Sequence, residues 1–550
     1  MSVQKEEYDI VEKAQLSVSA ESLTSDSESI SHNPFDDFHK AERWRKVYES
    51  SGYEGLSKFD PEFTWTKDEE KKLVRKMDLK IFLWVFIMFA FLDLIRKNIA
   101  RAVSDNFIVD LKMNTNDYNL GQTVYLVIFL ASELPGNLLS KRFGPERVIP
   151  VQIVLWSVIC ITQAGLKNRG QFIGTRCLLG MVQGGFIPDN ILYLSYYYTG
   201  AELTFRLSFF WCAIPLFQIL GSLLASGIIE MRGIHNLAGW QYLFIIEGFL
   251  SLSVGVASFY LMRRGPTQTG ESAFHKGKSL FTEYEEKIMV NRILRDDPSK
   301  GDMSNRQPVT FKEILYTLTE FDLWPLFIQG ITAFISLQTV GSYLSLILKS
   351  LNYSTFLSNI LAIPGQALLL INLPLAALLS RKLKEKSLCV GIANVWVLPF
   401  IVSLVALPTD TNPWIKYILL TGILGLPYTH SILAGWVSEI SNSVRSRTVG
   451  TALYNMSAQV GAIIASNMYR NDDKPYYTRG NKILLGFTCF NICMAVATKF
   501  YYISRNKYKD RKWNSMTKEE QIKEQQIRKK LIIGLFTRLS FRVLKFLLLE

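Results

Sequence analysis

Long apolar runs, separated by short polar segments, recur along most of the chain. Each run is about 18 to 25 residues long, which is the length that an α-helix needs to cross the hydrocarbon core of a bilayer. Because a helix satisfies its own backbone hydrogen bonds, such runs predict membrane-spanning helices. Twelve runs can be placed, near 79–100, 119–139, 148–166, 171–198, 205–229, 240–262, 323–348, 355–379, 387–407, 414–438, 448–469 and 482–503.

A long charged segment divides the runs into two groups of six. The sequence therefore predicts an all-α membrane protein with twelve transmembrane helices in two six-helix halves, which is the arrangement of major facilitator transporters. A count of eleven or thirteen stays open, because several runs carry charges. The predicted parts are a largely disordered first tail, a first half, a connecting loop, a second half and a second tail, over residues 1–76, 77–262, 263–322, 323–504 and 505–550.

Composition and charge narrow the function classes. The chain has 550 residues, 49% of them hydrophobic, and a formal net charge of +13. The basic residues flank the apolar runs, which favours a role beside the lipid bilayer over nucleic-acid binding. Their distribution predicts that both termini are cytosolic, although the loop before the last run is also basic. We expect no metal site, no bound cofactor, no enzymatic motif and a monomeric protein.

Charged residues inside the runs are candidate functional groups, since charge is costly in the membrane. Arg96 and Lys97 lie near the outer end of the first run, and Arg176 lies at a similar depth in the fourth. An Arg guanidinium can hold a carboxylate, sulfonate or sulfate through two hydrogen bonds. These three cations therefore predict a site for an anionic solute. The alternative for Arg96 and Lys97 is that they reach outward to the membrane interface.

Other polar residues of the runs are candidates for proton coupling or for lining a central cavity. Burial disfavours the charged form of a carboxyl, so Glu133 and, more weakly, Asp189 are candidate proton carriers. His430 can titrate near neutral pH, although a lone helix histidine is more often a packed polar residue. Gln338 and Asn455 are candidate substrate contacts, with hydrogen bonding between helices as the alternative.

Four segments match the motifs of a known family, namely residues 132–145, 176–188, 239–248 and 472–480. They resemble the fungal allantoate permease family, the anion:cation symporters of the major facilitator superfamily, and the similarity spans about residues 75 to 520. The resemblance implies a proton-coupled importer of the plasma membrane. Residues 93–106 most resemble the branch that carries sulfonates and inorganic sulfur anions, which implies sulfonates, sulfate, sulfite or thiosulfate as substrate. The alternatives are an organic carboxylate such as allantoate, nicotinate or another vitamin, and a nutrient receptor that transports nothing.

The loop after the second run resembles the gate motif of the superfamily. The matching positions here are Lys141, Arg142 and Gly144, and Lys141 stands where the motif usually has Asp. Many members of the family have Glu at the position of Gln183 and Gly at that of Asp189. These departures argue against a proton role at Gln183 and raise interest in Asp189.

Overall fold

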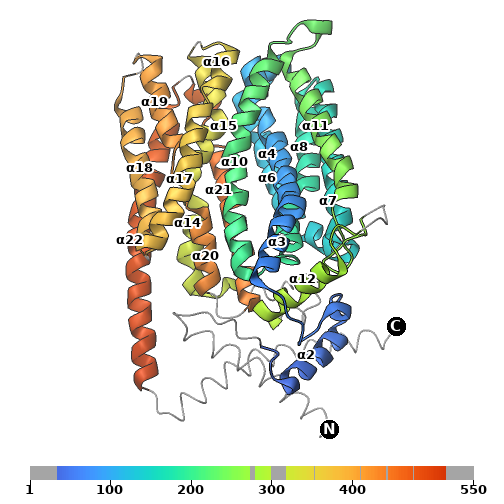
Figure 1. Cartoon of the computed structure of the whole chain (residues 1–550). Helices are drawn as coiled ribbons and strands as arrows, with labels where there is room; N and C mark the ends of the chain where they lie inside the picture. The colour runs from blue at the N-terminus through green and yellow to red at the C-terminus, as the bar shows by residue number, and fades with distance from the viewer. Residues whose placement is uncertain are drawn as a thin grey trace, which may run out of the picture.

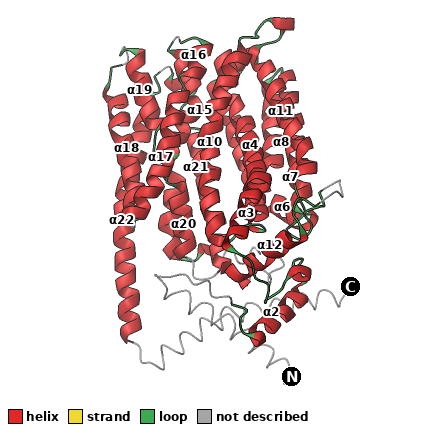
Figure 2. Ribbon diagram, viewed as in Figure 1, coloured by secondary structure: helices red, strands yellow, loops and turns green. Residues whose placement is uncertain are grey.

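The fold consists of helices joined by loops. The computed structural model describes residues 34–272, 279–298, 317–351, 353–383, 385–408, 411–440, 444–474 and 476–515. In these ranges there is no strand, and Figure 2 shows a bundle of roughly parallel helices. The all-α prediction is therefore confirmed.

Six helical segments form the first half of the bundle. They are α4 (Leu83–Ala102), α6 (Thr115–Phe143), α7 (Pro145–Thr162), α8 with α9 (Arg169–Gln183 and Phe186–Ser195), α10 (Gly200–Ile229) and α11 (Gly239–Leu261). The fourth segment is the only interrupted one of this described set, since two glycines separate α8 from α9.

Six further segments form the second half. They are α14 with α15 (Trp324–Thr332 and Ile335–Ser350), α16 with α17 (Thr355–Ile360 and Ile363–Leu383), α18 (Ser387–Ala406), α19 with α20 (Pro413–Leu424 and His430–Ile440), α21 (Val444–Ala465) and α22 (Thr478–Ser515). The described bundle thus consists of twelve helical segments in two groups of six. In Figure 1 the halves stand side by side, with α10 of the first half against α16 and α17 of the second.

Seven segments are long and apolar enough, by length and composition, to cross a membrane. They are α7, α10, α11, α14 with α15, α16 with α17, α18 and α22. The remaining segments of the described bundle are α4, α6, α8 with α9, α19 with α20, and α21. These five carry all the candidate substrate and proton residues except Gln338. Charged residues in α4, and the interruptions between α8 and α9 and between α19 and α20, set these segments apart from the seven.

Short sequence signals begin several helices. In each, the side chain of the residue before the helix accepts a hydrogen bond from the backbone N–H three residues later. The side chain of that later residue accepts a hydrogen bond from the backbone N–H of the first. Such capping boxes are formed by Thr66 with Glu69, Asn114 with Asp117, and Thr282 with Glu285. They fix where α3 (Lys67–Met77), α6 and α12 (Glu283–Asp296) start.

Part of the expected disordered tail is folded. From residue 34 onward it forms α2 (Phe38–Ser51) and α3, which lie with α12 at one end of the bundle (Figure 1). Apolar residues of this tail pack against Val290 and Leu294 of α12, among them Trp44, Tyr48 and Phe59. Burial of these aromatic rings explains why the segment folds. Residues 1–33 lie outside the described residues. We call this end of the bundle the α12 side, and the opposite end the far side.

Arg292 connects the tail, the connecting loop and the first half. This buried guanidinium lies 2.9 Å from a Glu202 oxygen on α10 and 3.6 Å from a Glu70 oxygen on α3. It also donates to the backbone oxygen of Tyr197, at 3.0 Å. One side chain of α12 thus ties three separate parts of the chain together.

The variant Arg292→Met should lower the melting temperature of the purified protein by a few degrees. It removes charge-assisted hydrogen bonds whose loss costs about 2 kcal/mol, and it leaves Glu202 without its cation. Lys46→Met is the matched control, because the Lys46–Glu42 pair is exposed and such pairs contribute little. Equal melting temperatures for the two variants would contradict the role of Arg292.

Candidate functional site

Two arginines of the first half meet at one tyrosine. The Nε of Arg96 on α4 donates to the Tyr125 hydroxyl of α6, at 2.7 Å. The guanidinium of Arg176 on α8 lies over the Tyr125 ring, 5.0 Å from its centre. The same hydroxyl donates to Oε1 of Gln183, at 2.6 Å. The structure thus brings together two of the three predicted cations, through a tyrosine that the sequence did not single out.

Close packing of α6 and α8 makes this meeting possible. Arg176, Gly180 and Gln183 follow one another at four and three residues, so they share one face of α8. A Cβ at Gly180 would lie 2.5 Å from the Tyr125 backbone oxygen. Any larger residue there would push the helices apart and separate Tyr125 from Arg176.

The same two helices also touch at the break between α8 and α9. A Cβ at Gly184 would lie 2.6 Å from Cβ of Ser132, and Gly185 has a φ of +84°, in the left-handed region that favours glycine. The break therefore depends on both glycines.

Arg176 is buried and has hydrogen-bond donors that no described residue occupies, as expected of a residue that binds an anion. Its side chain is 1% exposed, and its Nη2 donates to Oε1 of Gln122 at 3.1 Å. Its Nε and Nη1 have no hydrogen-bond partner among the described residues. Among the described residues, no carboxylate forms an ion pair with it. A buried donor without a partner is costly, so a bound anion would stabilise this arrangement.

Lys97, the third predicted cation, lies beside Asp93 on α4. Asp93 is buried and interacts electrostatically with Lys97, Arg96 and Arg101. Its carboxylate accepts a hydrogen bond from the side chain of Gln218 on α10. Asp93 is not among the candidate residues predicted from the sequence. Its position three and four residues before two cations is the signal that could have found it.

A second buried ion pair was also missed. Arg101 of α4 lies 3.6 Å from Glu247 of α11, whose side chain is 0% exposed. A Cβ at Gly221 of α10 would lie 2.3 Å from the guanidinium of Arg101, so this glycine leaves room for the pair. Opposite charges on distant segments give no pattern in sequence, which is why Glu247 was not predicted as a partner.

The two candidate carboxyls have different surroundings. Glu133 is half-buried on α6, and Arg96 is the cation that acts on it. Asp189 is buried in the first turn of α9, on the other side of the glycine break from Arg176. Arg176 and Asp189 are thirteen positions apart, which would correspond to about 20 Å in a continuous helix. Glu133 is therefore the one associated with the cation pair.

The candidate residues of the second half lie at its centre. His430 is 5% exposed and begins α20, with Tyr454 Oη 3.1 Å from its Nδ1. Asn455 of α21 bonds with the His430 side chain. Gln338 is half-buried on α15, and its Oε1 has no hydrogen-bond partner in the described part of the chain.

The predicted gate residues lie at the turn between α6 and α7. Gly144 has a φ of +90°, and a Cβ there would lie 2.4 Å from Oε2 of Glu146. Arg142 is exposed, with its guanidinium 5.5 Å from the centre of the Phe143 ring. The side chain of Lys141 is outside the described residues. The turn thus needs glycine, and the gating role of these residues stays a prediction.

Comparison with known proteins identifies the family. The sequence profile of the Major Facilitator Superfamily matches residues 85–466. The chain belongs to the major facilitator superfamily. It is therefore a multi-pass membrane protein with the fold of a secondary transporter.

Two relatives and two solved structures agree with this family. An uncharacterized transporter of Saccharomyces cerevisiae is 43% identical over 31% of this chain and 99% of its own length. Another, of Schizosaccharomyces pombe, is 25% identical over 80% of this chain and 84% of its own. A bacterial homologue of the human lysosomal transporter Spinster covers 80% of this chain and 97% of its own, at 14% identity and a TM-score of 0.54. The xylose transporter XylE from E. coli covers 77% of this chain and 97% of its own, at 14% identity and a TM-score of 0.55.

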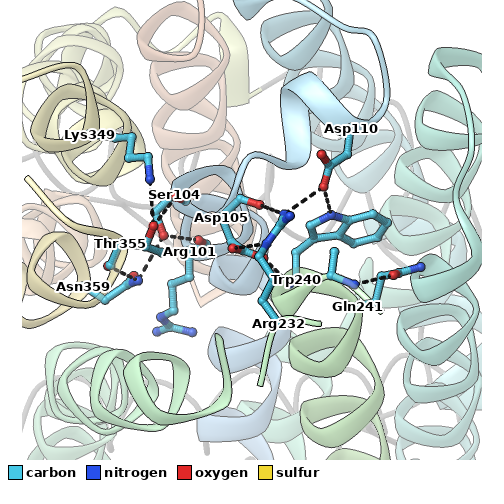
Figure 3. A network of polar contacts seen from close by, with 11 residues as sticks. Arg101, Ser104, Asp105, Asp110, Arg232, Trp240, Gln241, Lys349, Thr355 and Asn359 are labelled. Carbon is cyan, nitrogen blue, oxygen red and sulfur yellow. Dashed lines mark hydrogen bonds and ion pairs between the residues drawn. The ribbon is translucent and has the colours of Figure 1, made fainter. Parts of the chain in front are cut away.

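On the far side, this major facilitator chain has a charged network within its first half (Figure 3). Asp105 accepts hydrogen bonds from Nε of Arg232 at 2.9 Å and from the backbone N–H of Trp240 at 2.8 Å. Asp110 accepts from Nη2 of Arg232 at 3.0 Å and from Nε1 of Trp240 at 2.8 Å. The network holds the segment after α4 against the start of α11.

The segment held in this way contacts the second half. Asn359 Nδ2 donates to Oγ of Ser104 at 3.0 Å. Thr355 Oγ1 donates to the backbone oxygen of the same serine, Ser104, at 3.1 Å. Asn119 of α6 donates to the Tyr469 backbone oxygen at 2.9 Å. Further contacts join Thr123 to Ser466 and Asn467. The halves are thus joined on the far side, and these contacts must break whenever that side opens.

Asn359→Leu should therefore favour opening of the far side. Losing the bond to Ser104 costs about 1 kcal/mol or more, which corresponds to roughly a fivefold to tenfold change in the open population. We would replace the six native cysteines, introduce Ser466→Cys, and measure its labelling by a charged maleimide in membranes. The expected result is faster labelling in the Asn359→Leu background.

Asn190→Leu is the matched control, because the Asn190 amide bonds within its own helix to Phe186. Labelling that is equally slow in both backgrounds would contradict the role of Asn359 as a contact between the halves.

Proposed function

We propose that the protein is a proton-coupled symporter that imports small anionic sulfur compounds, namely sulfonates, sulfate, sulfite and thiosulfate, across the plasma membrane. In this proposal the α12 side and both termini are cytosolic. The observation that carries it is the buried Arg176, which shares Tyr125 with Arg96, has two donors without a described partner and forms no ion pair with a described carboxylate.

The chemistry of a sulfur oxyanion suits this pair of cations. A sulfonate or sulfate presents two or three oxygens to one side, and a guanidinium presents its donors in a planar fork. Nε and Nη1 of Arg176 are two such donors without a described partner. Arg96, Lys97, Gln338 and Asn455 would complete the contacts with the substrate. The resemblance of residues 93–106 to the sulfur-carrying branch of the allantoate permease family supports this substrate class.

A proton would accompany the anion. Glu133 is our first candidate for the coupling group, because the positive charge of Arg96 interacts with it. Arg96 is also one of the proposed substrate contacts. When an anion binds Arg96, the charge that favours ionised Glu133 is partly cancelled, so a proton binds more readily. Asp189 and His430 are further candidates. Lys141, Arg142 and Gly144 would act at the cytosolic gate as the halves alternate.

An organic carboxylate is the second candidate substrate, because an arginine fork serves carboxylates as well. Allantoate, nicotinate and other vitamins belong to this class. A receptor that binds a nutrient without moving it is the alternative of another kind. Measuring substrate uptake distinguishes the receptor from a transporter, because a receptor at the cell surface binds its ligand without taking it into the cell.

Arg176→Ala should reduce the uptake of radiolabelled sulfonate or sulfate by about tenfold to a hundredfold, because it removes charge-assisted hydrogen bonds of about 1.5 to 3 kcal/mol. The assay uses cells that lack their own sulfur carriers. Arg169→Ala is the control on the same helix, where the arginine is half exposed and pairs with Asp117. Undiminished uptake by Arg176→Ala would refute the anion site, and rescue by allantoate or nicotinate alone would replace the substrate class.

Uptake should rise as the external pH falls, because the proton gradient drives the anion inward. Glu133→Gln cannot release or take up a proton, so this pH dependence should disappear while exchange of labelled for unlabelled substrate continues. Glu439→Gln is the control, since that carboxylate is mostly exposed and pairs with Lys386. Retention of the pH dependence in Glu133→Gln would assign the proton to another group.

A further inference from the structure

A ring of aromatic side chains surrounds His430 between the two halves. Centres of four rings lie near that of its imidazole: Trp211 at 5.0 Å, Tyr454 at 5.1 Å, Tyr428 at 5.6 Å and Phe334 at 6.0 Å. The Tyr428 ring stacks on the imidazole with 17° between the planes, whereas Trp211 meets it edge-on at 71°. We call these five residues the aromatic box. Trp211 belongs to the first half, and the other four belong to the second.

The box adjoins the charged face of α4. Trp211 lies edge-on to Phe89 at 6.0 Å, and Phe89 is one helical turn before Asp93. The charge of Asp93 also acts on the Tyr428 hydroxyl, which therefore lies close to the first half. Asp93 in turn lies three and four residues before Arg96 and Lys97 on the same helix, so the box and these two cations adjoin one stretch of α4.

The box coincides with a break in a membrane helix. The chain between α19 and α20, from residue 425 to residue 429, is not helical, and Pro427 lies within it. Two side chains satisfy the carbonyls there: Asn372 Nδ2 donates to Gly425 at 2.6 Å, and Trp396 Nε1 donates to Gly422 at 3.0 Å. Discontinuous helices of this kind recur at transporter binding sites, where irregular backbone lines a cavity.

The members of the box differ in exposure. Phe334, His430 and Tyr454 are buried, and Tyr454 and Asn455 orient the imidazole. Trp211 and Tyr428 retain accessible surface. The buried rings therefore act as a support, and the two accessible rings can receive a ligand.

We infer that the aromatic box is a subsite for the planar, apolar body of an organic anion whose charged group is held by Arg96 and Arg176. Aromatic sulfonates and carboxylates are then bound in preference to inorganic sulfate. Aromatic rings attract one another in stacked and edge-on geometries beyond simple burial, and both geometries are present in the box. The inference rests on the proposed anion site and adds the second part of the substrate.

The test is the thermal stabilisation of the purified full-length protein by four anions: sulfate, methanesulfonate, benzenesulfonate and benzoate. A ligand that binds only the folded protein stabilises it by RT ln(1 + [L]/Kd), so the concentration that gives a chosen rise in melting temperature scales with Kd. Benzenesulfonate and benzoate should give the same rise at concentrations at least tenfold lower than sulfate and methanesulfonate. Trp211→Leu should reduce this advantage to about twofold, with methanesulfonate unchanged.

Two further variants keep the test decisive. Tyr428→Leu removes the other accessible ring and should give the same loss, in case Trp211→Leu does not fold. Trp436→Leu is the control, because Trp436 of α20 contacts Tyr502 outside the box, and it should keep the full advantage.

Each outcome decides the inference. If methanesulfonate and benzenesulfonate stabilise equally, or if Trp211→Leu and Tyr428→Leu weaken both alike, the box only packs the interior, and the anion site stands without it. If none of the four anions stabilises the protein, the anion site itself falls, and the subsite falls with it.

Discussion

The bundle is organised around positive charge that is buried without an opposite charge of its own. A guanidinium inside a membrane protein is costly, and Arg176 forms no ion pair with a described carboxylate. Three contacts each offset part of this cost. They are the face of the Tyr125 ring, the amide of Gln122 and the close approach of the helices at Gly180. The remaining donors are left for a solute.

The two halves contribute different chemistry to the interior. The first half supplies charge, through Arg96, Lys97 and Arg176, and the second supplies His430 and three of the four rings around it. Arg96 and Lys97 lie on α4, whereas Arg176 and His430 lie on segments that are interrupted by a break. Trp211 of the first half contacts His430 of the second, so the two halves meet at the aromatic box.

The sequence was sufficient for the fold and for part of the site. Run length and grouping predicted the two halves, and helical rise placed Arg96 and Arg176 at one depth, where both contact Tyr125. The pairing of Arg101 with Glu247 could not be foreseen, since it joins helices whose rotation is set by packing. His430 was expected in mid-helix but begins α20 after a break, because no local pattern reports how Asn372 and Trp396 compensate for it.

Contacts within the first half are stronger than the contacts between the halves. Asp105, Asp110 and Arg232 form charge-assisted hydrogen bonds inside the first half, whereas Ser104 and Asn359 make a neutral one across to the second. Charge-assisted bonds are about twice as strong as neutral ones, and each neutral bond contributes only about 1 kcal/mol. The first half should therefore move as a unit while its contacts with the second break and re-form, which is the distribution of strength that a carrier with alternating access requires.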